Sequence, residues 1–216
     1  MPTQIDNNSI PQDTDLIWRK LTLSVNHSAD DLKLHIQRIL FCLDNNLSDF
    51  SAGALQDLFI ALQENGRDLR LRMFNLISPL LDYSERRYFQ QSLEASLDNN
   101  EGLQVFECYQ GSVLAEKYYQ CGDESKNHLP GTVVEFNNKS EEANYLIASG
   151  KLSEARTMLE SICMDDNDKQ LSEDLQSYYF YSKDKQGLEQ FMAKMSQKSR
   201  KLSSSWLALR ESSKIW

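Results

Sequence analysis

The amino-acid sequence predicts an all-α protein, built from an N-terminal helical bundle followed by antiparallel helix pairs. Apolar residues recur at three- and four-residue spacing through most of the 216-residue chain, which is the period of an amphipathic helix. Only 8 glycines and 4 prolines are present, fewer than a loop-rich β-sandwich needs. The length is sufficient for one helical domain, or two small ones, with a substantial core.

The N-terminal bundle is predicted over residues 1–120. Its helices are expected at 32–43, 51–64, 67–81, 85–97 and 102–119. The first follows residues 28–31, which have the form of a capping box. Ser51 is expected to cap the second, and Gly66 to follow its end. Residues 16–25 fit either a helix or a strand, because their apolar positions satisfy both periods.

A linker is predicted at residues 121–137, where a Pro-Gly turn signal interrupts the helical pattern. The second unit, residues 138–216, is expected to hold helical hairpins and a basic C-terminal helix. Its helices are predicted at 138–149, 153–164, 170–182, 187–201 and 203–213.

Residues 144–168 carry the most specific pattern in the chain. One helix ends at Gly150, a second begins almost at once, and the small Ala155 occupies a position where two helices cross closely. Together with Leu146 and Leu152, this pattern resembles a tetratricopeptide repeat. Leu188 follows Leu152 by 36 residues, near the family period of about 34, and corresponds to Leu152 in a second, degenerate helix pair. The resemblance covers residues 139–200 in all.

The resemblance implies a protein-binding scaffold, adaptor or chaperone whose helix pairs line a groove for a partner's helix or extended peptide. Small, acidic chaperones of bacterial secretion systems are one such class in the family. Mapped onto this chain, the groove residues on the first helix are Asn137, Ser140, Asn144 and Ile147. No cofactor, metal or small-molecule substrate is implied.

Four consecutive aromatic residues at 178–181 must point around most of a helix. Two readings follow: all of them pack in the core, or some contact a partner. In the second reading, Tyr178 and Tyr181 join the groove.

The charge is unevenly distributed. From residue 183 onward there are eight basic and three acidic residues, which gives this segment a charge of +5. Because the net charge of the chain is −9, the first 182 residues carry −14. The basic segment either caps the helix stack or docks an acidic partner protein. Its expected docking residues are Lys194, Lys198, Arg200, Lys201 and Trp206. The alternative functions are a regulator that contacts nucleic acid through this segment and a structural subunit of a larger complex.

The sequence argues against an enzyme. The three histidines lie in no H-E-x-x-H, and neither a phosphate-binding glycine loop nor a G-x-S-x-G occurs. No apolar run is long enough to span a membrane, and residues 1–9 lack the features of a secretory signal. The four cysteines are dispersed with no C-x-x-C, which favours a reducing compartment. We therefore expect a cytoplasmic, non-catalytic protein.

Overall fold

The computed structural model describes residues 12–63, 65–98, 108–119, 136–165, 169–198 and 203–216. Within these ranges every regular element is helical, so the predicted all-α class is confirmed. The elements are α1 (Gln12–His27), α2 (Leu32–Asp44), α3 (Ser48–Leu62), α4 (Arg67–Ile77), the 3₁₀ turn η1 (Ser78–Leu80), α5 (Tyr83–Asp98), α6 (Leu114–Tyr119), α7 (Lys139–Ala148), α8 (Leu152–Asp165), α9 (Lys169–Ser182), α10 (Lys185–Gln197), α11 (Ser204–Ser212) and the 3₁₀ turn η2 (Ser213–Ile215). None of the described helices is both long enough and apolar enough to cross a membrane.

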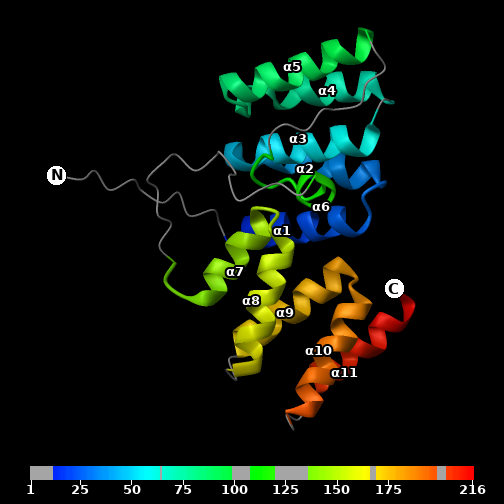
Figure 1. Cartoon of the computed structure of the whole chain (residues 1–216). Coiled ribbons are helices and arrows are strands. Elements are labelled where there is room, and N and C mark those ends of the chain that lie inside the picture. The colour runs from blue at the N-terminus through cyan, green and yellow to red at the C-terminus, as the bar shows by residue number, and fades with distance from the viewer. Residues whose placement is uncertain (1–11, 64, 99–107, 120–135, 166–168, 199–202) are drawn as a thin grey trace, which may run out of the picture.

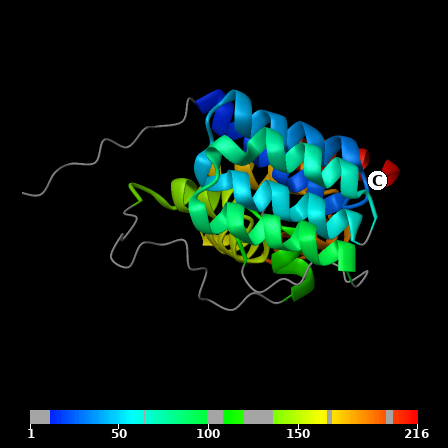
Figure 2. The same cartoon turned by 90° about the horizontal axis from the view of Figure 1, so that it is seen from above.

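The helices form two groups that meet at α1 (Figure 1). Above α1, the helices α2 to α5 lie in layers and run nearly parallel or antiparallel, as the view from above shows (Figure 2). Below α1, the helices α7 to α11 form the second group (Figure 1). Helix α1 packs against α2 on one side and against α7 and α9 on the other. Helix α1 therefore packs between the two groups and contributes to both.

This position explains the ambiguous pattern at residues 16–25. Trp18 belongs to the core of the first group, whereas Leu23 and Val25 belong to the core of the second. All three side chains are at most 3% exposed. A helix that is buried on two sides has apolar residues around much of its circumference, so its pattern loses a clean helical period.

Two predicted caps differ from those in the structure. Helix α2 begins after Asp31, whose carboxylate accepts a hydrogen bond from the backbone N–H of Lys33 at 3.0 Å, so Ser28 is not the cap. Helix α3 begins at Ser48, three residues earlier than predicted. Ser51 therefore lies inside the helix, where its hydroxyl donates to the carbonyl of Leu47 at 2.7 Å.

The predicted helix at 102–119 is wrong for residues 108–113, which form an irregular segment before α6. Gly53 of α3 allows this segment to approach closely. A Cβ atom at Gly53 would lie 2.3 Å from the carbonyl oxygen of Gln110 and 2.4 Å from the backbone nitrogen of Ser112. Gly111 has φ +88°, a backbone conformation that favours glycine and interrupts a helix.

A buried carboxylate holds this segment in place. Asp57 of α3 is fully buried and accepts hydrogen bonds from the backbone N–H groups of Val113 and Leu114 and from the hydroxyl of Ser112. These donors lie at the start of α6, where a carboxylate stabilises the unpaired N–H groups. Asp57 also forms an ion pair with Arg38 of α2, which is likewise fully buried.

Arg38 connects the carboxylate to the segment before α6 and to α1. Its guanidinium donates to the carbonyl of Gly111 and lies 4.4 Å from the centre of the Trp18 ring. The indole N–H of Trp18 donates to the carbonyl of Ala148 at 2.9 Å, and the N–H of Gly111 donates to the carbonyl of Ser149 at 2.9 Å. The end of α7 is thereby tied to α1, α2 and α3.

The cysteines are not all free. Cys42 and Cys163 are buried free thiols, whereas Cys108 is disulfide-bonded. The disulfide at Cys108 does not fit the reducing compartment that the dispersed cysteines favour, and the cytoplasmic location stays a prediction.

A second polar cluster joins α8, α9 and α10. Glu160 of α8 accepts hydrogen bonds from Arg156 at 2.7 Å, from the hydroxyl of Tyr179 at 2.7 Å and from Lys194 at 3.2 Å. Arg156 also pairs with Asp184, the cap of α10, at 2.8 Å. Burial alone would raise the pKa of Glu160, but the hydrogen bonds from Arg156, Tyr179 and Lys194 lower it overall.

We expect Glu160→Gln to lower the free energy of unfolding by about 1–2 kcal/mol at pH 7, because it removes a charge-assisted acceptor shared by three donors. The folded state lowers the pKa of Glu160, so this stabilisation is full above its ordinary value of about 4.3 and is lost as the pH falls through the folded pKa. The gap between the wild type and the variant should therefore narrow below about pH 4.3.

Urea unfolding followed by circular dichroism between pH 7 and pH 3 measures this gap. Glu189→Gln is the matched control, since Glu189 lies exposed on α10. A gap that stays constant over the whole range would contradict a stabilising role for the ionised carboxylate.

Candidate functional site

The predicted groove face on α7 and α9 is covered by α1. Arg19 of α1 donates to the side-chain oxygen of Asn144, and the ammonium of Lys20 lies 5.2 Å from the centre of the Tyr181 ring. Ile147 and Tyr178 are buried, and the hydroxyl of Tyr178 donates to the carbonyl of Leu152 at 3.2 Å. These residues therefore make contacts inside the chain.

The two remaining groove residues are held by neighbours as well. The hydroxyl of Ser140 donates to Asp174 of α9, and Asn137 donates to Glu141 through its backbone N–H at 2.9 Å and its side-chain amide at 3.0 Å. A peptide that contacted Asn144 or Tyr181 would have to replace their contacts with Arg19 and Lys20 of α1.

Of the docking residues expected in the basic segment, the structure describes Lys194, Lys198 and Trp206. Trp206 is 2% exposed and packs against Tyr179 and Phe191, with its indole N–H on the hydroxyl of Ser172. It is a core residue, which corrects the expectation that it faces a partner. Lys194 pairs with Glu160, and Lys198 is exposed. Arg200 and Lys201 lie outside the described residues.

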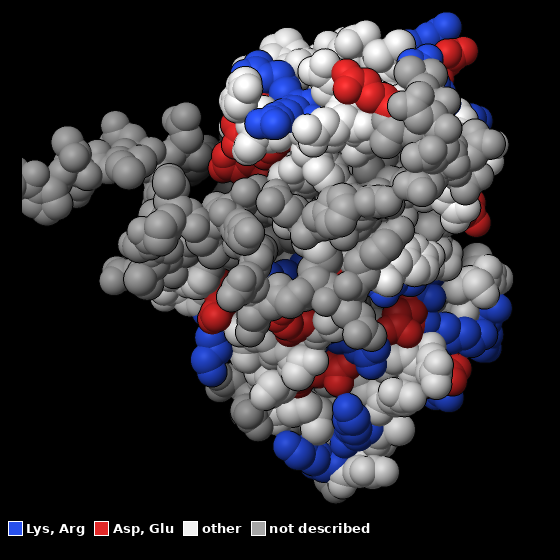
Figure 3. Space-filling model, turned by 45° about the horizontal axis from the view of Figure 1, so that its top comes forward, with Lys and Arg blue, Asp and Glu red and all other residues white. Residues whose placement is uncertain are grey.

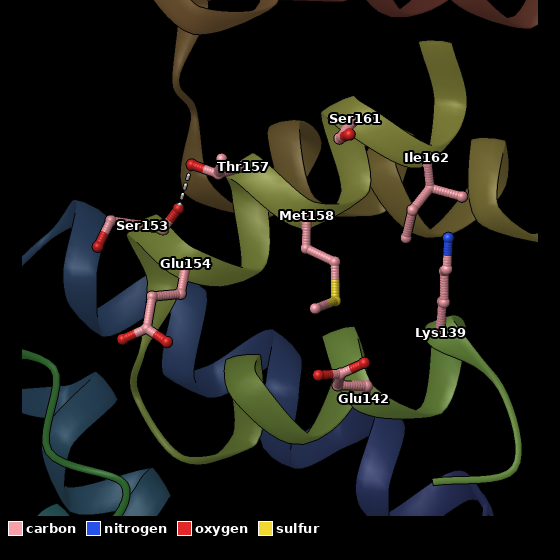
Figure 4. Close-up of a pocket in the computed structure, with 8 residues that line it drawn as sticks. All are labelled: Lys139, Glu142, Ser153, Glu154, Thr157, Met158, Ser161 and Ile162. Atoms are coloured by element: carbon pink, nitrogen blue, oxygen red, sulfur yellow. Dashed lines mark hydrogen bonds between the residues drawn. The ribbon is translucent and has the colours of Figure 1, made fainter. Parts of the chain in front are cut away.

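A pocket of about 610 Å³ lies along α7 and α8. The described residues that line it are Lys139, Glu142, Ser153, Glu154, Thr157, Met158, Ser161 and Ile162. Figure 4 shows that Met158 of α8 points towards Glu142 of α7, and that Lys139 of α7 extends towards Ile162 of α8. None of these described lining residues belongs to α1 or α9, so the pocket is separate from the covered face.

The pocket has an apolar floor and a charged edge. Ile162 is 5% exposed and Met158 is half-buried against the core, so both present part of their surface to the pocket. Among the described residues, neither Lys139 nor Glu142 has an ion-pair partner, whereas Glu154 lies 3.9 Å from Lys151. An apolar centre with a polar edge is the arrangement of residues found at protein interfaces.

One hydroxyl in the pocket is engaged within its own helix. The hydroxyl of Thr157 donates to the carbonyl of Ser153 at 2.9 Å, which is an ordinary contact within a helix (Figure 4). The described residues that line the pocket include neither histidine nor cysteine.

The residues of this pocket were not identified from the sequence, although a signal is present. The core side of α8 carries Leu159 and Cys163. Met158 and Ile162 each precede one of these by one position, so they form a second apolar stripe beside the first. A helix with two neighbouring apolar stripes has more apolar surface than a single neighbour covers.

No family model, curated protein or solved structure matches the chain. The turn between α7 and α8 contains Gly150 at φ +89°, and Ala155 is fully buried. The relation to tetratricopeptide repeats stays a prediction that rests on the sequence pattern of this hairpin.

Proposed function

We propose that this protein is a non-catalytic, protein-binding adaptor, scaffold or dedicated chaperone that holds a helix or extended peptide of its partner in the α7–α8 pocket. The observation that supports this function best is the apolar floor of Met158 and Ile162 beside Lys139 and Glu142, whose charges have no ion-pair partner among the residues that the structure describes. A partner would place an apolar anchor on the floor and polar groups at the edge, as in helix-in-groove recognition.

The charge pattern supports a protein partner over nucleic acid. Among the described residues on the face drawn in Figure 3, acidic and basic side chains are interspersed. The chain carries a net charge of −9. Nucleic-acid binding draws most of its affinity from many phosphate contacts on a basic surface.

Site-specific photo-crosslinking in the native cells tests this function. A benzophenone amino acid replaces Thr157, which is exposed at the pocket, and separately replaces Gln91, which is exposed on α5. We expect a discrete crosslinked protein at position 157 that is absent at position 91. Met158→Glu places a charge on the apolar floor and should reduce the crosslinked product by at least about tenfold.

Circular dichroism of the Met158→Glu variant checks that the fold persists. The proposal fails if positions 157 and 91 yield the same products, or if the product at position 157 persists in folded Met158→Glu.

A further inference from the structure

A cluster of aromatic rings and lysines lies where α9 ends, away from the α7–α8 pocket. It consists of Lys20, Phe180, Tyr181, Lys183 and Trp216, and we call it the aromatic–lysine cluster. The rings of Phe180 and Tyr181 meet edge to face with centres 5.1 Å apart, and Phe180 meets Trp216 in the same way at 6.3 Å. Each contact joins the next, so the five side chains form one continuous unit.

The cluster presents both apolar surface and positive charge. Phe180 is 41% exposed, and Ile215, the neighbour of Trp216, is 90% exposed. Lys183 is held over two rings, 4.1 Å from the centre of Phe180 and 4.8 Å from that of Trp216. Surface aromatic residues beside cations are enriched at interfaces, where one body supplies both contact area and charge.

Neither lysine of the cluster has a carboxylate partner among the described residues. The acidic groups nearest in sequence are already engaged. Asp184 pairs with Arg156 and caps α10, and Glu211 pairs with Lys214 at 2.6 Å. Two ammonium groups without a partner, on a chain of net charge −9, therefore mark a local site for negative charge.

The backbone at Lys183 supports a fixed position for its side chain. Lys183 has φ +52° in the turn between α9 and α10, a conformation that few residues other than glycine and asparagine adopt. An uncommon backbone conformation at a charged residue is a reason to look for a role of that side chain. Here the conformation accompanies an ammonium placed over two aromatic rings.

We propose that the aromatic–lysine cluster binds an acidic segment of a partner protein that carries an apolar side chain next to its carboxylates. The carboxylates pair with Lys20 and Lys183, and the apolar side chain covers Phe180 and Ile215. This surface is independent of the α7–α8 pocket and extends the function beyond it.

The ring geometry favours an acidic protein segment over single-stranded nucleic acid. Nucleic-acid bases bind aromatic residues by stacking on their faces. In the cluster, Lys183 lies over the faces of Phe180 and Trp216, and Lys20 lies over Tyr181. The cations therefore occupy ring faces that bases would use.

Fluorescence anisotropy with labelled 12-residue peptides tests the proposal on the full chain at low salt. The probe alternates Glu and Leu, and the reference probe alternates Gln and Leu. We expect the wild type to bind the Glu–Leu probe and to bind the Gln–Leu probe at least about fivefold more weakly. Lys183→Asn should weaken Glu–Leu binding by at least about fivefold, and adding Lys20→Gln should weaken it further.

Lys183→Asn suits this test because asparagine adopts positive φ readily, so the turn persists. Lys33→Gln is the charge-matched control, since Lys33 is exposed on α2, and this variant should bind the probe as the wild type does.

Several results would overturn the proposal: no binding of the Glu–Leu probe by the wild type, equal binding of both probes, or unchanged binding by the folded double variant. Labelled 12-residue oligothymidylate is measured alongside. If it binds more tightly than the Glu–Leu peptide and loses affinity in the same variants, the cluster is a nucleic-acid surface.

Discussion

Asp57→Ala is expected to lower the free energy of unfolding by about 3–5 kcal/mol. Its carboxylate is fully buried and serves Arg38, the hydroxyl of Ser112 and the N–H groups at the start of α6. Removing it leaves a buried guanidinium without its counter-ion and several donors without an acceptor. Few single changes in this chain would leave so many buried polar groups unsatisfied.

Chemical unfolding followed by circular dichroism measures this loss, with Asp49→Ala as the control. Asp49 is an exposed acid in the first turn of the same helix, so its removal should cost at most about 1 kcal/mol. If the two variants lose equal stability, Asp57 does not hold the segment before α6.

The companion variant Arg38→Met separates the ion pair from the helix cap. It removes the partner charge but leaves Asp57 bonded to Ser112, Val113 and Leu114. We expect Arg38→Met to cost less than Asp57→Ala, because the carboxylate retains three donors whereas the guanidinium would retain only the carbonyl of Gly111.

Helices could be predicted from the sequence where local periodicity determines them. The predicted helix at 153–164 differs from α8 by one residue at each end, and the predicted helix at 85–97 lies within α5. The predicted helices are wrong where contacts with residues distant in the sequence determine the backbone conformation. Residues 108–113 follow a helical pattern, yet they are held outside a helix by Asp57 and Gly53, more than fifty residues earlier in the chain. No local window contains that information.

The candidate site shows the same limit. The predicted groove residues Asn144 and Tyr181 do lie on neighbouring helices, but the sequence gives no sign that α1 covers them. That contact depends on packing between residues more than a hundred positions apart. For Trp206 the sequence pattern allows two positions, because an aromatic residue in a basic segment is compatible with both a surface and a core. In the structure Trp206 lies in the core.

Gly53→Ala is expected to lower the free energy of unfolding by about 2–4 kcal/mol, against the usual preference for alanine in a helix. That preference alone would stabilise α3 by about 1 kcal/mol. The added Cβ would lie 2.3 Å from the carbonyl oxygen of Gln110 and 2.4 Å from the nitrogen of Ser112, both backbone atoms. Backbone atoms cannot rotate away as a side chain can, so the whole segment must shift.

Two comparisons make this expectation specific. Ser177→Ala, at an exposed position inside α9, should be neutral or slightly stabilising, because it gains propensity without a clash. The loss of unfolding free energy for Gly187→Ala should lie between those of Ser177→Ala and Gly53→Ala. The added Cβ at position 187 would meet side-chain atoms of Asp184 and Arg156, which can rotate away. A Gly53→Ala variant as stable as the wild type would mean that residues 108–113 do not pack against α3.

The effects of Gly53→Ala and Asp57→Ala should not add. Both positions act on the same segment, one by allowing its approach and the other by binding its N–H groups. Once alanine at position 53 has displaced the segment, Asp57 has already lost part of its hydrogen bonding. Asp57→Ala should therefore cost less in the Gly53→Ala background than alone, and a double-mutant cycle in urea measures the difference. Full additivity would show that helix packing at Gly53 and capping at Asp57 stabilise the fold independently.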